Sequence, residues 1–499
     1  MADRLAAVRA RTLADSHGVP YVDLEQRSLD PDAVRSVPLE LLERLVALPY
    51  ERSEHGLRVA FADPSPASVA EIEHACGLRV EVAVAHRDAV RTLLDELAYG
   101  GTLRDEELQL EGALLEDAPA VRLVNDLLRR AIASRASDIH MIPEGSYVHV
   151  RQRVDGVVQE SVVLSAEDAA GAVARIKVLG GLDLAERRRP QDGRFSVKTT
   201  TGRAIDLRVA LLPTIAGEGV VLRLLDKTRT PPSLTQLGLE NAMQMQLERI
   251  IDRGVGAFLV TGPTGSGKTT TLHGALADLA RPQRTVITIE DPVEYELPGA
   301  YQLQVNSTAG VTFPTALRAV LRGDPDVIMV GEIRDTETAD LALGGALAGH
   351  FMLSTLHTAD APSAVTRLLE MGVERYIVSA GLAGVLAQRL ARRLCLYCRE
   401  PYAPAQDVLE HAGCTDPHAT FFRAVGCRYC SGGHYGRIGI FQLMVLDDEL
   451  RALVSAGGTH DALLAAARSA GMESMWADGV AKAQAGVISL DELYRVLNR

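Results

Sequence analysis

Residues 256–279 read GAFLVTGPTGSGKTTTLHGALADL and place a glycine-rich loop between an apolar run and a helical run. The loop satisfies G-x-x-x-x-G-K-[ST]. Its nucleotide-binding candidates are Gly262, Pro263, Thr264, Gly265, Ser266, Gly267, Lys268, Thr269 and Thr270. Glycines let backbone N–H groups turn toward phosphates, Lys268 brings a charge to the β/γ oxygens, and the Thr269 hydroxyl can reach Mg²⁺. A strand, this loop and a helix in that order predict a P-loop nucleotide site.

The sequence around this loop has a pattern that is typical of a parallel β-sheet. Apolar runs precede helices that open with glycine, as in GAFLVTG, RTVITIED, PDVIMVGE and HFMLSTLH. Ligands bind outside the carboxyl ends of such strands, so Glu290 and Glu332, which end two of them, are expected near Lys268. Hydrolysis of a phosphoanhydride needs a Mg²⁺ ligand and a group that orients or deprotonates water, and carboxylates can supply both.

A chain of 499 residues is long enough for about three to five domains. The patterns predict an N-terminal α/β or α+β domain over 1–105, an acidic linker over 106–117 and a middle α+β domain over 118–230. The middle domain is expected to have four strands and one crossing helix. Residues 231–499 form the nucleotide-binding domain, with an insert over 390–437 and C-terminal helices over 445–499.

Composition limits the class of protein. With 47% hydrophobic and 23% charged residues the chain is a folded globular protein, and a net charge of -13 with 4% aromatic residues argues against a nucleic-acid binder. No run approaches the roughly 18 apolar residues of a spanning helix, and the first residues lack a signal sequence, so a cytosolic protein is expected.

Four of the six cysteines form two CxxC pairs, Cys395 with Cys398 and Cys427 with Cys430, separated by 28 residues. Four thiolates suit tetrahedral Zn²⁺, and a site with no open position is structural rather than catalytic. The alternative is a redox pair or inert thiols.

Several ordered motifs resemble those of the secretion ATPases, the motor proteins of type II secretion and type IV pilus assembly. GPTGSGKTTT, ITIEDPVEY, LRGDPDVIMVGEIRD and GHFMLSTLHTADAP resemble their Walker A, aspartate, Walker B and histidine boxes. The likeness extends upstream through SDIHMIPE, RRRPQDGRFSV and IDLRVALLP, and downstream through the cysteines to GRIGIFQLM, so it covers about 118–450.

This resemblance implies an α/β multidomain protein with a RecA-like ATPase domain, a PAS-like middle domain, an N-terminal docking domain and a zinc-binding insert. It implies ATP, Mg²⁺ and Zn²⁺ as cofactors, and it gives Glu290 and Glu332 the Mg²⁺ and water-activating roles. His350 and His357 would contact the γ-phosphate region, and Arg194 and Arg208 of the middle domain would act as arginine fingers.

The resemblance also implies a ring, a hexamer, that works at the inner face of the cytoplasmic membrane. Its expected partners are an inner-membrane platform protein and a docking protein of the machine, with no nucleic acid. Gly219, Gly323 and Ala359 depart from the family pattern, and the weaker likeness of the first hundred residues does not predict a cyclic dinucleotide ligand. Type II secretion and pilus extension both remain open, and the rival class is a P-loop nucleic-acid translocase.

Overall fold

The computed structural model describes residues 2–497 except 25–26, 28, 54–55, 101–107, 110–117, 200–202, 227–230, 415, 417–418 and 428. The predicted linker therefore lies outside the described residues apart from Leu108 and Gln109. The chain divides into two compact units, each built from separated stretches. The first unit comprises Met1–Thr102, Ala391–Arg437 and Gly479–Arg499, and the second comprises Leu103–Leu390 and Ile438–Asp478. The domain boundaries drawn from the sequence stay a prediction.

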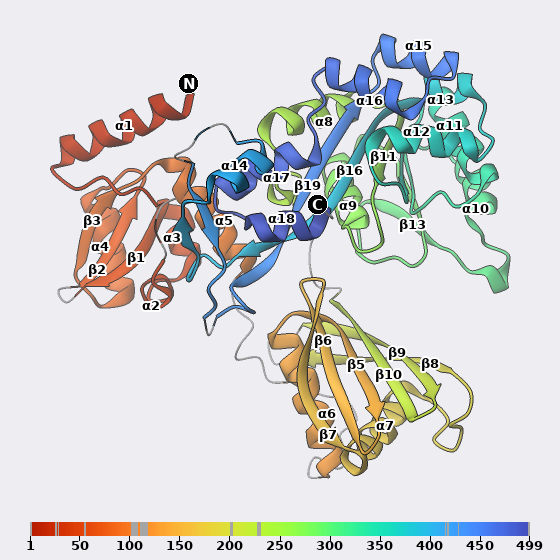
Figure 1. Cartoon of the computed structure of the whole chain (residues 1–499), viewed down its shortest axis with the longest axis horizontal. Helices are drawn as coiled ribbons and strands as arrows, with labels where there is room; N and C mark the ends of the chain where they lie inside the picture. The colour runs from red at the N-terminus through yellow and green to blue at the C-terminus, as the bar shows by residue number, and fades with distance from the viewer. Residues whose placement is uncertain are drawn as a thin grey trace. The chain divides into compact units, whose positions relative to one another are not determined.

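The N-terminal part of the first unit is a three-stranded sheet with helices packed against it, and it contains one large hydrophobic core and a smaller apolar cluster between α1 and β3 (Figure 1). Its elements are α1 (Ala2–His17), α2 (Pro31–Arg35), α3 (Leu39–Leu45), β1 (Ala47–Ser53), β2 (Gly56–Phe61), α4 (Pro66–Cys76), β3 (Val80–Val84) and α5 (Arg87–Gly100). The run LELLERLVALPY is helical only in its first half. Val46 adopts a left-handed φ of 48°, which ends α3 and lets β1 begin at Ala47.

The rest of the first unit is the cysteine-containing insert and the last helix. Its elements are β17 (Glu400–Tyr402), α14 (Gln406–Ala412), β18 (Phe421–Arg423) and α18 (Leu490–Leu497). Glu492 of α18 is 2% exposed and accepts hydrogen bonds from the Arg392 backbone and side chain and from Arg495. These bonds hold the pKa of Glu492 at about 2, although burial alone raises it. The helix is therefore tied to the first residues of the insert by a buried ion cluster.

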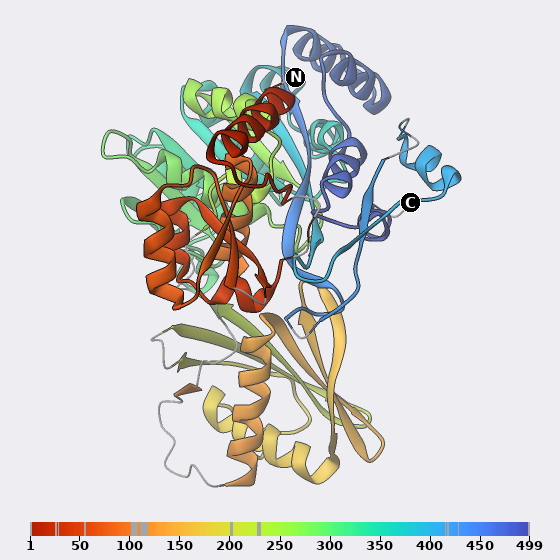
Figure 2. The ribbon, with the colours of Figure 1, turned by 90° about the vertical axis from the view of Figure 1, so that its left-hand side faces the viewer.

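The middle domain, in the second unit, is an antiparallel sheet of order β4-β8-β9-β10-β5-β6-β7. Its elements are β4 (Leu108–Gln109), α6 (Pro119–Ala133), β5 (Ala136–Glu144), β6 (Tyr147–Val154), β7 (Val157–Ser165), α7 (Ala166–Gly180), β8 (Gln191–Thr199), β9 (Ala204–Thr214) and β10 (Gly217–Asp226). Helices α6 and α7 cover one face, where the core lies (Figure 2).

The expectation of four strands in the middle domain is wrong, because two turns were missed. Arg135 takes a left-handed φ of 58°, which ends α6 and lets a further strand, β5, begin at Ala136. Asp155 and Gly156, both with positive φ, form the tight turn between β6 and β7 within what looked like one strand.

The remaining sheet of the second unit has the order β13-β12-β14-β15-β11-β16-β19. Its strands are β11 (Gly256–Thr261), β12 (Val286–Glu290), β13 (Ala300–Gln304), β14 (Val327–Val330), β15 (Phe351–Leu356), β16 (Leu382–Leu394) and β19 (His434–Val445). All five pairings between neighbouring strands from β13 to β16 are parallel. The strand β15 lies between the P-loop strand β11 and β14.

Helices cover both faces of this sheet. The helices are α8 (Asn241–Arg253), α9 (Lys268–Leu279), α10 (Phe313–Val320), α11 (Thr336–Leu347), α12 (Ala361–Glu370), α13 (Arg375–Gly381), α15 (Asp448–Ala456), α16 (His460–Ser469) and α17 (Met475–Gln484), with short turns η1 (Thr235–Leu237) and η2 (Ser307–Ala309). Alternate residues of β11 explain the two layers, because Phe258 and Val260 pack toward α8 and α9 whereas Ala257 and Leu259 pack toward α10–α13. The mixed α/β class expected from the sequence is confirmed.

Candidate functional site

The P-loop connects β11 to α9 and lies against β16. Gly262, Gly265 and Gly267 all have positive φ, of 153°, 77° and 85°. A Cβ on Gly262 would come within 2.4 Å of the Gln388 carbonyl oxygen, and one on Gly267 within 2.9 Å of the Gln388 Nε2. Only glycine fits the loop at these two positions, because both backbone conformation and space exclude a side chain. Gln388 of β16 was not found from the sequence.

Lys268 begins α9, and its side chain turns back over the loop. Its ammonium donates hydrogen bonds to the carbonyl oxygens of Gly262 at 2.9 Å and Pro263 at 3.1 Å, and the residue is 9% exposed. Burial lowers the pKa of Lys268, while the negative charge of Glu332 opposes that effect. The charge expected at the phosphates is thus held at the loop with Glu332 as its electrostatic partner.

Glu332 follows β14 and belongs to a group of charged side chains at the carboxyl edge of the sheet. It forms an ion pair with Arg334, and its Oε2 lies 3.7 Å from His357 Nε2. Burial and the nearby charge of Lys268 lower the pKa of His357. The structure therefore brings Lys268, Glu332 and His357 together.

Glu290 ends β12 at the same edge, but its carboxylate is enclosed. His273 of α9 bonds through Nε2 to Glu290 Oε2 at 3.0 Å, while Thr288 and Gln302 donate to Oε1 at 2.7 and 3.1 Å. Glu290 is 2% exposed and His273 is fully buried. Burial raises the pKa of Glu290, but the hydrogen bonds outweigh it, so the pKa is lower than usual. His273 was missed from the sequence, although it lies five residues after the P-loop lysine on the helix that the loop opens.

The two histidines of the histidine box lie at opposite ends of one strand. His350 precedes β15 and His357 follows it, so about 20 Å of extended chain separates them. His350 lines a cavity of about 330 Å³ with Asp252, Arg284 and Asp326 at the amino edge of the sheet. Only His357 is placed beside the P-loop residues.

Arg194 and Arg208 are directly paired across β8 and β9, and both are exposed. Arg208 is in turn paired with Arg223 of β10, and Arg223 with Asp138 of β5. The Arg223 guanidinium lies 2.9 Å from the buried Asp138 carboxylate. A row of three arginines therefore crosses the face of the middle sheet opposite its helices. Arg223 was missed because its alignment depends on the register of the β9–β10 hairpin.

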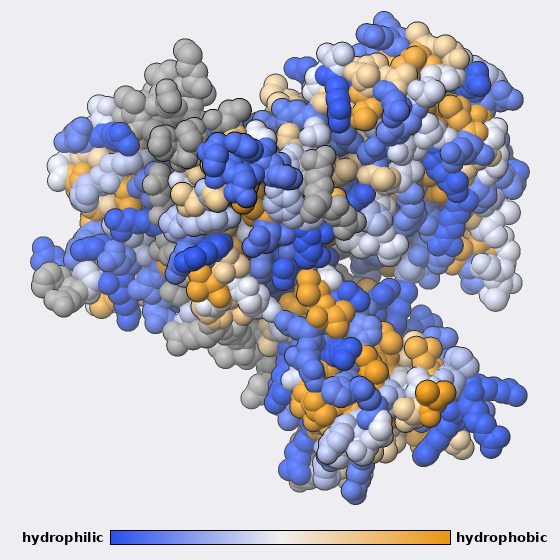
Figure 3. Space-filling model, in the orientation of Figure 1, coloured by the Kyte–Doolittle hydropathy of each residue, from blue (hydrophilic) through white to orange (hydrophobic). Residues whose placement is uncertain are grey.

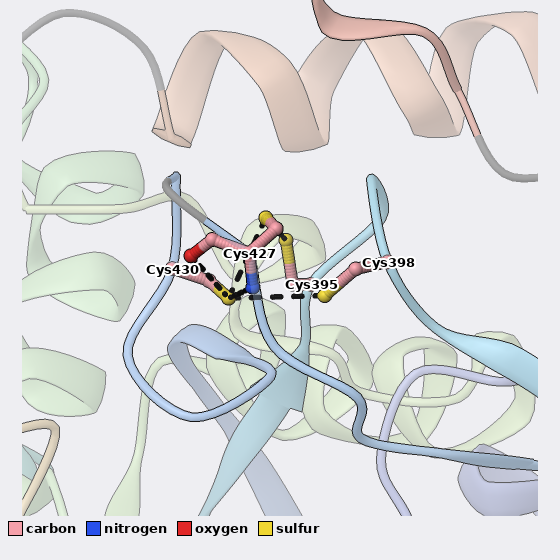
Figure 4. Close-up of side chains that lie close together, drawn as sticks. All are labelled: Cys395, Cys398, Cys427 and Cys430. Carbon is pink, nitrogen blue, oxygen red and sulfur yellow. Dashed lines mark hydrogen bonds between the residues drawn. The ribbon is translucent and has the colours of Figure 1, made fainter.

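The four cysteines converge from two loops, and Figure 4 shows their sulfur atoms turned toward one another. All four ligand atoms lie within 4.8 Å of one another, and the three closest Sγ pairs are 3.6, 3.7 and 3.8 Å apart. A tetrahedron with Zn–S bonds of about 2.3 Å has S···S edges of about 3.8 Å. These distances are far longer than a disulfide bond. The cluster fits a four-coordinate metal and does not fit a redox disulfide as it stands.

Comparison with known proteins gives two family matches. A model described as type II/IV secretion system protein matches residues 113–495, and a model of the MshEN domain matches residues 17–105. The first match covers more than half of the chain. This chain belongs to the type II/IV secretion system protein family.

Curated relatives of this family are similar over most of the chain. The type IV pilus assembly ATPase PilB of Myxococcus xanthus is 39% identical over 505 residues, covering 96% of this chain and 89% of the relative. The type II secretion system protein HxcR of Pseudomonas aeruginosa is 48% identical over 382 residues, covering 76% and 78%. The type II secretion system protein E of Dickeya dadantii is 41% identical over 469 residues, covering 93% and 88%.

A solved structure, the ATPase DotB of Legionella pneumophila, has a similar fold, with a TM-score of 0.56 and 22% identity over 79% of this chain and 98% of DotB. The resemblance to secretion ATPases is confirmed, and the rival class of nucleic-acid translocase is not supported. Among the described helices none combines the length and apolarity that crossing a membrane requires.

Proposed function

We propose that this chain hydrolyses ATP to power the assembly of pilus or pseudopilus subunits through an inner-membrane platform. The meeting of Lys268 with Glu332 at the carboxyl edge of a RecA-like sheet, in a member of the secretion family, carries the proposal. Relatives at comparable identity are named for pilus assembly and for type II secretion, so the proposal includes both machines. The protein would work in the cytoplasm at the inner face of the membrane.

The chemistry would be divided among a few residues. The P-loop N–H groups and Lys268 bind the phosphates, Thr269 contributes a hydroxyl to Mg²⁺, and Glu332 orients or deprotonates water beside them. His357, which lies next to Glu332, is suited to respond to the γ-phosphate. Glu290 contributes as a fixed anion, because three donors hold it in place.

The substitution Lys268→Ala tests whether the P-loop supports ATP hydrolysis. We expect ATP turnover to vanish while Lys482→Ala, which changes a lysine of α17 outside the nucleotide-binding motif, leaves it unchanged. In cells that carry the Lys268→Ala chain, one activity should be lost. Loss of surface fibres would assign the protein to pilus assembly, and loss of protein export would assign it to type II secretion. Turnover at the normal rate by Lys268→Ala would refute the proposal, and so would turnover that requires DNA.

We propose that Cys395, Cys398, Cys427 and Cys430 hold a structural Zn²⁺. The S···S distances and the absence of an open position support this assignment. Backbone N–H groups of Gly426 and Cys427 donate to Cys398 and Cys430 sulfurs at 3.3 and 3.2 Å, as expected for sulfurs that carry negative charge. Metal analysis of purified protein should find about one zinc per chain, and Cys395→Ser should lose it. Protein purified without chelator and free of zinc would refute the site.

We propose that the protein works as a hexameric ring in which Arg194 and Arg208 reach ATP bound to another subunit. Eight of the fourteen exposed large apolar side chains among the described residues lie in the middle domain, and Figure 3 shows several on the face in view. Where such side chains form a contiguous patch, they favour contact with another protein surface. Either arginine replaced by alanine should keep nucleotide affinity and lower turnover at least tenfold, as for arginine fingers.

Mixing Arg208→Ala chains with Lys268→Ala chains tests whether the contact is between subunits. Each variant can supply what the other lacks at a shared interface, so hydrolysis should return in the mixture. Labelled chains must first show that subunits exchange. If they exchange and the mixture stays inactive, the contact between subunits is refuted and the ATPase remains.

A further inference from the structure

Each CxxC loop carries a tyrosine immediately before its second cysteine. The loops read Cys395-Leu396-Tyr397-Cys398 and, from Cys427, end in Tyr429-Cys430. The rings of Tyr397 and Tyr429 lie 5.5 Å apart with an interplanar angle of 55°. The same cluster that gathers four thiols therefore also places two aromatic rings side by side.

These tyrosines contact helix α2 of the N-terminal domain, within the first unit. The Arg35 guanidinium lies over the Tyr429 ring, 4.4 Å from its centroid, and the Tyr429 hydroxyl donates to Asp32 Oδ1 at 3.2 Å. Asp32 and Arg35 are three residues apart and so share one face of the helix. One aromatic side chain thus engages both charged groups of that face.

The first loop makes the apolar half of the same contact. Leu396 and Tyr397 pack against the core of the N-terminal domain, and the Leu29 N–H donates to the Leu396 carbonyl oxygen at 3.4 Å. The Tyr397 side chain is partly buried in this contact. The contact combines a backbone hydrogen bond, apolar packing and a cation–π pair.

We infer that the two CxxC loops form the docking surface for α2, and that metal binding by the four cysteines switches this surface on. Four bonds to one ion fix the two loops relative to each other, and Tyr397 and Tyr429 each adjoin a ligand cysteine. When the metal leaves, the loops keep only backbone contacts such as the hydrogen bond from the Cys395 N–H to the Gly433 carbonyl oxygen at 2.8 Å, the tyrosines separate, and the N-terminal domain is released. The inference rests on the proposed zinc site.

The position of the two CxxC loops in the chain connects this docking surface directly to the nucleotide-binding sheet. β16 ends at Leu394, directly before Cys395, and β16 pairs with the P-loop strand β11. A partner protein that binds the N-terminal domain would therefore act through α2 on a segment continuous with a strand of the nucleotide-binding sheet. The metal site lies within that connection, so it links α2 to β16 and does more than stabilise the two loops.

Hydrogen exchange of the full chain, read by mass spectrometry, tests the docking. Arg35→Ala should keep one zinc per chain and normal ATP turnover, yet the peptide spanning Leu29 to Arg35 should exchange about two- to fivefold faster, as loss of an exposed cation–π contact implies. Arg27→Ala is the matched control, because the described contacts of Arg27 are with Tyr50 and Glu51, both within the N-terminal domain. Unchanged exchange in Arg35→Ala, or an equal increase in Arg27→Ala, would refute docking on these loops.

Chelation tests the control by metal. Removing zinc from the native chain should accelerate exchange in α2 at least as much as Arg35→Ala does, while α4, elsewhere in the same domain, stays protected. Readdition of Zn²⁺ should reverse the change. Metal loss with no change in α2 would refute the switch and leave the zinc site standing, whereas protein that never contained zinc would refute the site itself.

Discussion

The ends of β12 and β14 look alike in the sequence but differ in the structure. Each strand delivers a glutamate to the same edge of the sheet. Glu332, whose side chain is 21% exposed, lies beside Lys268 and His357, whereas Glu290 is buried among His273, Thr288 and Gln302. Glu290 is the last residue of its strand, while Glu332 comes two residues after its own. The end of a strand therefore places a carboxylate at the edge of the sheet. It does not determine whether that carboxylate faces the ligand or the protein interior.

The largest difference should appear in the rate of hydrolysis. Glu332→Gln removes the carboxylate next to the P-loop lysine, so kcat should fall by about 10²- to 10⁴-fold while ATP still binds. Single-turnover kinetics and nucleotide-binding measurements check this. Hydrolysis by Glu332→Gln at the rate of the unaltered protein would show that the exposed glutamate is not the one that acts on water.

The free energy of unfolding should distinguish the two glutamates in the opposite order, with the larger loss for Glu290. Glu290→Gln leaves buried donors mismatched, so the free energy of unfolding should fall by about 1–3 kcal/mol, whereas Glu332→Gln should change it by no more than about 0.5 kcal/mol. Because the pKa of Glu290 is lowered by its donors, this contribution is fully present above about pH 4.5 and is lost as the pH falls further. Denaturant unfolding at pH 7 and pH 3.5 measures it. Equal losses at both pH values would contradict the assignment.

His273 determines whether the enclosed carboxylate serves the reaction or only the fold. His273→Phe removes the bond to Glu290 Oε2, and His273→Asn keeps a donor there. If Glu290 acts as a fixed anion, His273→Phe should lower kcat roughly tenfold, as loss of an outer-shell partner does, and His273→Asn should recover part of it. The measurement is kcat against KM for both variants, with melting temperatures as the control. A fall in melting temperature without any change in kcat would make the network purely structural.

The smallest effect should come from the exposed ion pair between Arg334 and Glu332. The Arg334 side chain is 61% exposed, and surface ion pairs contribute between 0 and about 1 kcal/mol. Arg334→Gln should therefore shift the free energy of unfolding by less than about 1 kcal/mol, less than Glu290→Gln does. A larger loss would mean that the region around Glu332 is as tightly organised as that around Glu290.

What the sequence could predict was local. The P-loop, its strand and its helix are contiguous, so Lys268 and Thr269 were found from their spacing alone. The apolar strands located Glu290 and Glu332 at one edge. His350 and His357 came from the resemblance, and a motif does not reveal that a six-residue strand separates its two histidines. CxxC spacing likewise found the four cysteines.

What the sequence could not predict depended on pairing between distant segments. The environment of Glu290 is set by His273 and by Gln302 on the neighbouring strand β13, and that of the P-loop glycines by Gln388, more than a hundred residues later. Arg223 joins Arg194 and Arg208 only through the register of two hairpins. The contact of α2 with Tyr429 joins residues 397 positions apart, which no local pattern signals.

The discontinuous make-up of the first unit has a consequence during synthesis on the ribosome. Residues 1–102 emerge first, but Ala391–Arg437 follow only after the whole P-loop core has been made, and Gly479–Arg499 come last. At about 5–20 residues per second, the N-terminal domain waits roughly 15 to 70 s for the cysteine loops to appear. During that time the face of α2 bearing Asp32 and Arg35 cannot yet contact Tyr429. The N-terminal domain must therefore fold before the cysteine loops have been synthesised. The first unit is complete only when Gly479–Arg499 have left the ribosome.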